Sequence, residues 1–119
     1  MDILTHIEAG VSSEQVRDFQ QQFSLTAQHM AFLMTLSRKG YYNLLEQKKL
    51  GRQQTERFLR VQQVYEQALE TLESVENIHR WMHTYHAYLQ RVPYEVLDTF
   101  AGCREVEAEL IRLDHGVLS

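Results

Sequence analysis

The chain has 119 residues, which allows one domain or two very small halves. Its formal net charge of −4 argues against a strongly basic nucleic-acid-binding protein. No apolar run is long enough to span a membrane, and the first ten residues lack the pattern of a signal peptide. The single cysteine, Cys103, excludes an internal disulfide and is typical of a reducing compartment. We therefore expect a cytoplasmic protein with no membrane anchor.

The charges are unevenly distributed along the chain. Residues 37–60 contain seven basic and two acidic residues, whereas the residues from 73 onward contain eight acids, four arginines and no lysine. A basic middle followed by an acidic last third suggests different partners for the two parts, although charge runs are usually solvated helix faces.

The first half of the chain is predicted to consist of helices. Ser12 and Thr26 are candidate N-caps of two short helices, the first with a capping-box glutamine three residues later, and a third short helix is expected to start at Ser37. Gly51 then precedes a longer helix. This helix is expected over residues 52–72, with an apolar stripe at helical spacing: Phe58, Val61, Tyr65, Ala68, Leu69 and Leu72.

The second half is also predicted to be helical, so the expected fold class is all-α. Ser74 can cap a helix that runs to about His86, and Pro93 suits the first turn of a short helix. Gly102 is expected to begin the last helix and Gly116 to stop it. The stripe expected to face the core is Cys103, Val106, Leu110 and Leu113, and the residues expected to point outward are Glu105, Glu107, Glu109 and Arg112.

The stretch 13–50 has the spacing of a helix-turn-helix, with "MTLS" as the turn. In such a motif, the second helix enters the major groove, where Asn and Gln can each pair with an adenine edge. Thr35 stands where these turns usually have glycine, and Gly40 costs the second helix about 1 kcal/mol relative to alanine. A generic three-helix packing unit is the alternative. The candidate DNA-binding residues are Ser37, Arg38, Lys39, Tyr42, Asn43, Gln47 and Lys48.

Little in the sequence indicates catalysis or a metal site. His79, His83 and His86 stand at i, i+4 and i+7, a spacing that would let one helix face bind a transition metal. No carboxylate or thiolate joins them at matching spacing, so surface or interface histidines are the favoured interpretation. No nucleophile with a recognisable base and no glycine-rich phosphate loop is present. We expect no enzyme activity, no cofactor and no metal.

The segment from Val75 to the end resembles the toxin-binding domain of Xre/MbcA/ParS-type antitoxins. The resemblance rests on the order and spacing of Trp81, Leu89, Pro93, Val96, Leu97, Thr99, Gly102, Val106, Leu110 and Gly116. In the loop before the proline, His86 and Gln90 stand where the family pattern has Asn and Gly. Residues 10–72 resemble the Xre-type helix-turn-helix half, so we expect a DNA-binding domain over 1–72, ending in a long connecting helix, and a small toxin-binding domain over 73–119.

The resemblance implies an antitoxin of a type II toxin–antitoxin system. Its partner would be a RES-type toxin, which degrades NAD or transfers its ADP-ribosyl group, and the antitoxin would cover the toxin's active site. It also implies a complex with the toxin that autoregulates its operon through operator DNA. Because many helix-turn-helix proteins dimerise on two-fold symmetric operators, we also expect a homodimer, with the apolar 52–72 helix as a candidate interface. A stand-alone helix-turn-helix transcriptional regulator is the alternative. The expected toxin contacts are Glu109, Arg112, Asp114, His115, Gly116, Val117, Leu118 and Ser119.

Overall fold

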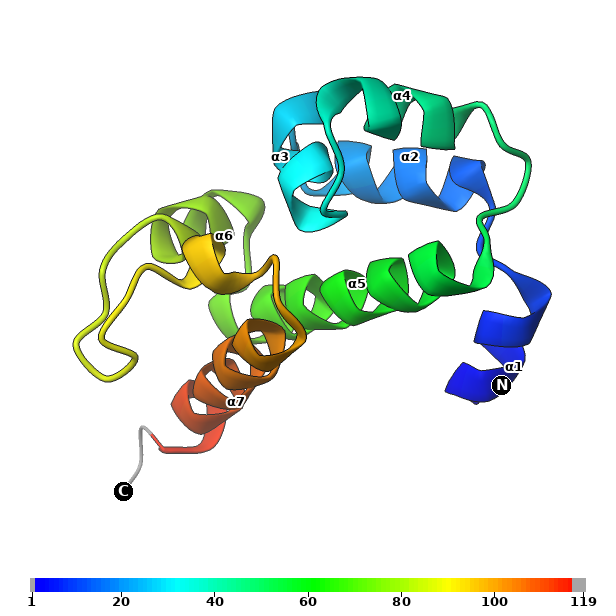
Figure 1. Cartoon of the computed structure of the whole chain (residues 1–119). Helices are drawn as coiled ribbons and strands as arrows, with labels where there is room; N and C mark the ends of the chain where they lie inside the picture. The colour runs from blue at the N-terminus through cyan, green and yellow to red at the C-terminus, as the bar shows by residue number, and fades with distance from the viewer. Residues whose placement is uncertain (1, 117–119) are drawn as a thin grey trace. The chain divides into compact units, whose positions relative to one another are not determined.

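The structure is a computed structural model that describes residues 2–116, with the side chains of residues 3 and 6 left aside. The predicted all-α fold is confirmed (Figure 1). The elements in chain order are α1 (Ile3–Ala9), α2 (Ser13–Gln22), α3 (Ala27–Leu33), α4 (Arg38–Leu45), α5 (Arg52–Leu72), α6 (Val75–Met82), the 3₁₀ helix η1 (Pro93–Val96) and α7 (Phe100–Gly116). Contacts divide the chain within α5 into two compact units, Met1–Leu59 and Arg60–Ser119. Across the part described, every helix falls short of the combined length and apolar character that crossing a bilayer requires.

In the first unit, local sequence signals define three short helices. The Ser12 and Thr26 side chains each accept from the backbone N–H three residues later, and the side chains at those third positions return the bond to complete capping boxes. Ser37 caps α4 by accepting from the Gly40 N–H at 2.9 Å. The two predicted N-caps, Ser12 and Thr26, are therefore confirmed, and the helix start expected at Ser37 is also capped. Helix α1 was not predicted from the sequence.

The core of the first unit is formed by α2, α3, α4 and the start of α5. The Phe19 ring lies 5.0 Å from that of Phe23 and 5.3 Å from that of Phe58, between ring centroids. The carbonyl groups at the ends of two helices are satisfied by arginines. Arg57 Nε donates to the Leu33 carbonyl at 2.7 Å, and Arg17 Nη2 donates to the Leu45 carbonyl at 2.9 Å. These bonds fix where α3 and α4 end.

Residues 34–37 form the turn between α3 and α4. Thr35 has φ 57°, in the left-handed region where a residue without a side chain is favoured. The Leu36 N–H donates to the Ala31 carbonyl at 2.8 Å, which closes the turn. Thr35 thus adopts the conformation for which glycine is usual, although the threonine is β-branched and strained there.

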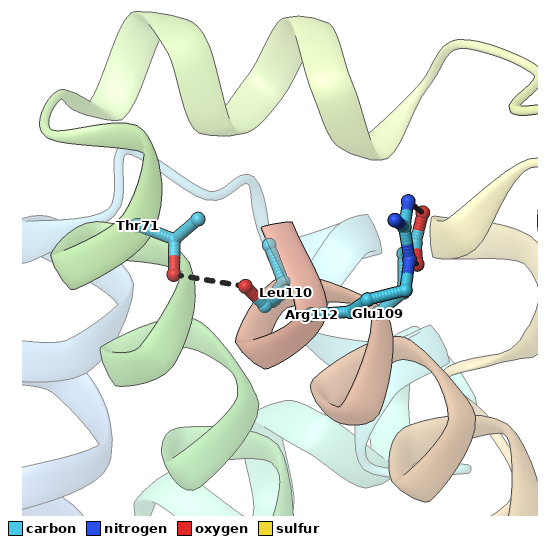
Figure 2. A network of polar contacts seen from close by, with 4 residues as sticks. All are labelled: Thr71, Glu109, Leu110 and Arg112. Carbon is cyan, nitrogen blue, oxygen red and sulfur yellow. Dashed lines mark hydrogen bonds and ion pairs between the residues drawn. The ribbon is translucent and has the colours of Figure 1, made fainter. Parts of the chain in front are cut away.

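The second unit consists of the C-terminal part of α5 together with α6, η1 and α7. In this unit, Thr71 Oγ1 of α5 donates to the Leu110 carbonyl of α7 at 3.3 Å (Figure 2). The N-terminal turn of α7 contacts η1 at Gly102, where an added Cβ would lie 1.8 Å from the Val96 carbonyl oxygen. Only glycine allows this approach. The fully buried side chains of this unit include Tyr65, Ile78, Met82, Leu97, Cys103, Val106 and Leu110.

Several predicted boundaries need correction. Helix α6 ends at Met82 instead of near His86, because the chain turns there and the His86 ring contacts the Trp81 carbonyl. Helix α7 begins at Phe100, two residues before Gly102, because the Thr99 hydroxyl accepts from the Gly102 N–H at 2.9 Å. The predicted helix over 52–72 is confirmed as α5.

The apolar stripe of α5 that was expected to form a dimer interface is partly covered within the chain. Phe58, Val61, Tyr65 and Ala68 of that stripe are buried, and Leu69 and Leu72 are half-buried. The homodimer interface on this helix stays a prediction.

Candidate functional site

The second unit contains an open groove of about 400 Å³ between α7 and the loop that joins α6 to η1. The loop contributes Tyr88, Leu89 and Arg91, and α7 contributes Glu105, Ala108, Glu109 and Arg112. The α7 residues recur every three or four positions, so they share one face of the helix. Leu89 and Ala108 supply apolar surface, and the remaining residues supply aromatic or charged groups.

A buried carboxylate organises one side of the groove. Glu109 is 5% exposed, and its two oxygens accept from Arg112 Nε at 2.6 Å and Nη2 at 2.9 Å. Figure 2 shows the two side chains extending together from α7, away from Thr71. This bidentate hydrogen bonding raises the pKa of Arg112. The Arg112 guanidinium also lies over the Tyr88 ring, 4.0 Å from its centroid, and so connects α7 to the loop.

The loop itself is folded back by its own hydrogen bonds. The His86 N–H donates to the Arg91 carbonyl at 3.1 Å, and the Gln90 N–H donates to the His86 carbonyl at 2.8 Å. Gln90 has φ 58°, the left-handed conformation, at the position where the family pattern has glycine. The His86 ring packs 4.7 Å from Trp81 and its Nε2 lies 2.8 Å from the Trp81 carbonyl. The loop is therefore anchored at its base to α6.

The residues predicted for the toxin contact lie in different environments. Arg112 is 41% exposed, and Asp114 and His115 are exposed on the last turns of α7. The prediction that Glu109 points outward is wrong, because its carboxylate is buried against Arg112. Gly116 is the last residue described and is half-buried. Val117, Leu118 and Ser119 lie outside the described residues.

The residues predicted for DNA binding belong to the first unit and are all exposed. Ser37, Arg38 and Lys39 stand at the start of α4, with Tyr42 and Asn43 one turn further on. Gln47 and Lys48 were predicted to lie on this helix, and that prediction is wrong. Helix α4 ends at Leu45, whose carbonyl accepts a hydrogen bond from Arg17. Gln47 and Lys48 follow the helix in the segment that leads to α5.

Tyr41, which is buried on this helix together with Leu44 and Leu45, anchors α4 to α2. Its hydroxyl donates to Gln20 Oε1, and burial raises the pKa of Tyr41 to about 12. Gly40 has little room, because an added Cβ would lie 3.2 Å from Ser37 Oγ. The exposed face of α4 thus lies opposite the face that carries Tyr41 and packs in the core.

The three histidines considered as a metal site are not brought together on one helix face. The rings of His79 and His83 are stacked with centroids 6.3 Å apart, whereas His86 lies beyond the end of α6 and contacts Trp81. Residues 2–116 contain no group of three His, Cys, Asp or Glu residues placed to hold a metal ion. Burial, followed by the nearby His79, lowers the pKa of His83. His83 also packs against Tyr94, whose pKa burial raises to about 12.

The loop side of the groove was missed by reasoning from sequence. Tyr85 is 60% exposed and Tyr88 is 69% exposed. From the sequence, Tyr85 is placed on a helix that runs to about His86 and Tyr88 is left in the loop before Pro93, with no role for either. Two tyrosines close to the only proline are a local signal of an aromatic loop, but only the tertiary fold places Tyr88 against Arg112.

Comparison with protein-family models identifies the second unit. Residues 67–116 match the model described as the antitoxin Xre/MbcA/ParS C-terminal toxin-binding domain. This span covers the end of α5, α6, η1 and α7, and it includes the whole groove. A search of curated proteins finds no match for the chain. The class of the matched segment is thus a toxin-binding domain. This segment therefore belongs to the Xre/MbcA/ParS C-terminal toxin-binding domain family, and the resemblance seen in this part of the sequence is confirmed.

Proposed function

We propose that this antitoxin neutralises a RES-type toxin by covering its active site with the toxin-binding domain, the C-terminal end of α7 pointing toward the cleft. The observation that supports this most is the family match over residues 67–116. An enzyme that consumes NAD has to bind an anionic dinucleotide. A docked helix would exclude that dinucleotide, and the exposed carboxylate of Asp114 is suited to pair with cationic groups that otherwise bind its phosphates. Inhibition of this kind is steric and electrostatic, takes place in the cytoplasm and needs neither catalysis nor a cofactor.

Co-expression with the protein encoded by the neighbouring reading frame tests this proposal. The wild-type chain should relieve the growth arrest that the toxin causes. Deletion of residues 116–119 and the charge reversal Asp114→Lys should each weaken protection while the far-UV circular dichroism spectrum stays unchanged. Glu70→Lys is the matched control, because Glu70 is an exposed acid on α5 of the same domain. Full protection by both altered chains would contradict the role of this end of α7.

We further propose that α3 and α4 form a helix-turn-helix that binds the operator. Arg38 and Lys39 would contact phosphates at the start of α4, and Asn43 would read a base edge. Replacing Arg38 and Lys39 by alanine should weaken binding to all sequences and reduce the slope of log K against log salt by about 2. Arg104→Ala, which removes an exposed arginine from the other unit, should leave the slope unchanged.

Operator binding of this kind usually involves a dimer, because operators have two-fold symmetry. We therefore propose a homodimer and a hetero-oligomeric complex with the toxin, and light scattering of each species gives its mass. The alternative function is a stand-alone transcriptional regulator. Operator binding by the protein alone, together with no protection against the neighbouring protein, would favour that alternative.

A further inference from the structure

We propose that the groove between the loop 83–91 and α7 is a second toxin contact that selects the partner, by accepting an apolar side chain of the toxin with an acidic residue beside it. This inference rests on the proposed function, since it assigns a further part of the same domain to the same partner. It differs from a contact made by the end of α7, because the groove begins two turns earlier on that helix.

The loop exposes residues of the type that dominate protein interfaces. Tyr88 exposes 69% of its surface and Tyr85 exposes 60%. Tyrosine and arginine are the residues most enriched at binding hot spots, since both present a large contact area with few rotatable bonds or several donors. Tyr88 contributes little burial to the fold, so the fold alone does not explain an aromatic side chain at this position.

The groove is also held in shape before any partner binds. Buried Glu109 fixes Arg112 through two hydrogen bonds, and the fixed guanidinium lies 4.0 Å from the centre of the Tyr88 ring. At its base, the loop is held by the hydrogen bond from the His86 N–H to the Arg91 carbonyl. Preorganisation of this kind lowers the entropy lost when side chains are ordered on binding.

The chemistry of the groove indicates what it accepts. Leu89 and Ala108 offer apolar surface between polar walls, which suits one inserted apolar side chain. Within residues 2–116 no carboxylate pairs with Arg91, whose Nε donates only to the Leu89 carbonyl at 3.1 Å. Arg112, by contrast, is already neutralised by Glu109. Arg91 is therefore the cation available to an acidic group of the toxin.

Binding of purified variants to the purified protein of the neighbouring reading frame, measured by calorimetry, tests the inference. Tyr88→Ala should weaken binding about 30-fold, which is typical of an interface hot spot. Arg91→Glu should weaken it more than Arg91→Gln, because the reversal adds repulsion. Leu4→Ala, at an exposed large side chain of the other unit, is the control and should bind as the wild type does.

The outcomes separate this inference from the function on which it rests. If the wild-type chain does not bind the toxin at all, the proposed function fails and the inference fails with it. If the wild type binds and both Tyr88→Ala and Arg91→Glu bind equally well, the inference alone is overturned. Unchanged Trp81 fluorescence in each variant would show that a loss of affinity is not a loss of fold, since Trp81 is the only tryptophan and lies in this unit.

Discussion

Replacing Gly102 by alanine should strongly destabilise the toxin-binding domain. The added Cβ would lie 1.8 Å from the Val96 carbonyl oxygen, 2.7 Å from the Val96 carbonyl carbon and 2.8 Å from Thr99 Oγ1. Ordinary contacts of this kind begin at 3.4 Å. Two of the three atoms belong to the backbone, so no side-chain rotation relieves the clash, and the start of α7 has to move away from η1.

The cost can be estimated from what this movement breaks. Leu97 and Cys103 are fully buried near the contact, and a gap of about 1 Å forfeits up to half of the dispersion energy across it. The movement also strains the hydrogen bonds from the Gly102 N–H to Thr99 Oγ1 and from Cys103 Sγ to the Leu97 carbonyl, each worth about 1 kcal/mol. Alanine recovers about 1 kcal/mol through its helix propensity. Overpacking against the backbone adds about 1 to 3 kcal/mol, so we expect a net loss of about 3 kcal/mol.

Urea unfolding followed by Trp81 fluorescence measures this loss, because the signal comes only from the second unit. For a domain of this size, about 3 kcal/mol lowers the urea midpoint by about 1 to 3 M. Gly51→Ala is the control, since an added Cβ there meets nothing within 4 Å, and it should change stability by less than about 0.5 kcal/mol. If the midpoint of Gly102→Ala equals that of the wild type, the contact between α7 and η1 does not depend on glycine and the reasoning is refuted.

Three further changes follow from the same structure. Thr35→Gly and Gln90→Gly each relieve a left-handed conformation that costs a non-glycine residue about 1 to 2 kcal/mol, whereas the greater freedom of glycine in the unfolded chain lowers the stability by about 0.4 to 1 kcal/mol. Each substitution should therefore raise the melting temperature slightly. A lower melting temperature in both would contradict the strain assigned to these residues. Arg112→Ala should lower the free energy of unfolding by about 1 to 3 kcal/mol, because it leaves the Glu109 carboxylate buried without its partner. The double variant that also carries Glu109→Leu should recover part of this loss. If it recovers none, the loss comes from the packing of the Arg112 side chain. The pKa of His83 is lowered in the folded state, so the unfolded chain binds the proton first as pH falls below about 6.5. The free energy of unfolding should therefore fall between pH 7.5 and 5.5, and it should fall by less in His83→Gln. An equal fall in both proteins would show that His83 is not the cause.

The sequence was sufficient to identify the helices that have local signals. Ser12, Thr26 and Ser37 act as N-caps because a side-chain hydroxyl needs only the backbone three residues away. The helix-turn-helix spacing and the family resemblance each located one special backbone position. At both Thr35 and Gln90 the expected residue was glycine, and at both the structure shows a positive φ. The conformation is retained even though the residue that adopts it most easily is absent.

The sequence alone did not define the candidate site. Periodicity extended α6 to His86, but the turn there depends on contacts between His86, Trp81 and Arg91, which are not a local pattern. The spacing of acids on α7 assigned Glu109 to solvent, whereas the fold buries its carboxylate against Arg112. Helical spacing specifies which residues share a face, and only the packing of the loop against that face determines which of them are covered.

The sequence by itself determined the all-α class, the caps and the family of the toxin-binding domain, because these depend on local bonds and on the order of a few small or apolar residues. Only the tertiary structure decided that Gly102 is required by the approach of Val96, and that Tyr88, Arg112 and Glu109 act as one unit beside the groove. Both depend on distances between segments that are separate in the sequence, and such distances are set by how helices and loops pack.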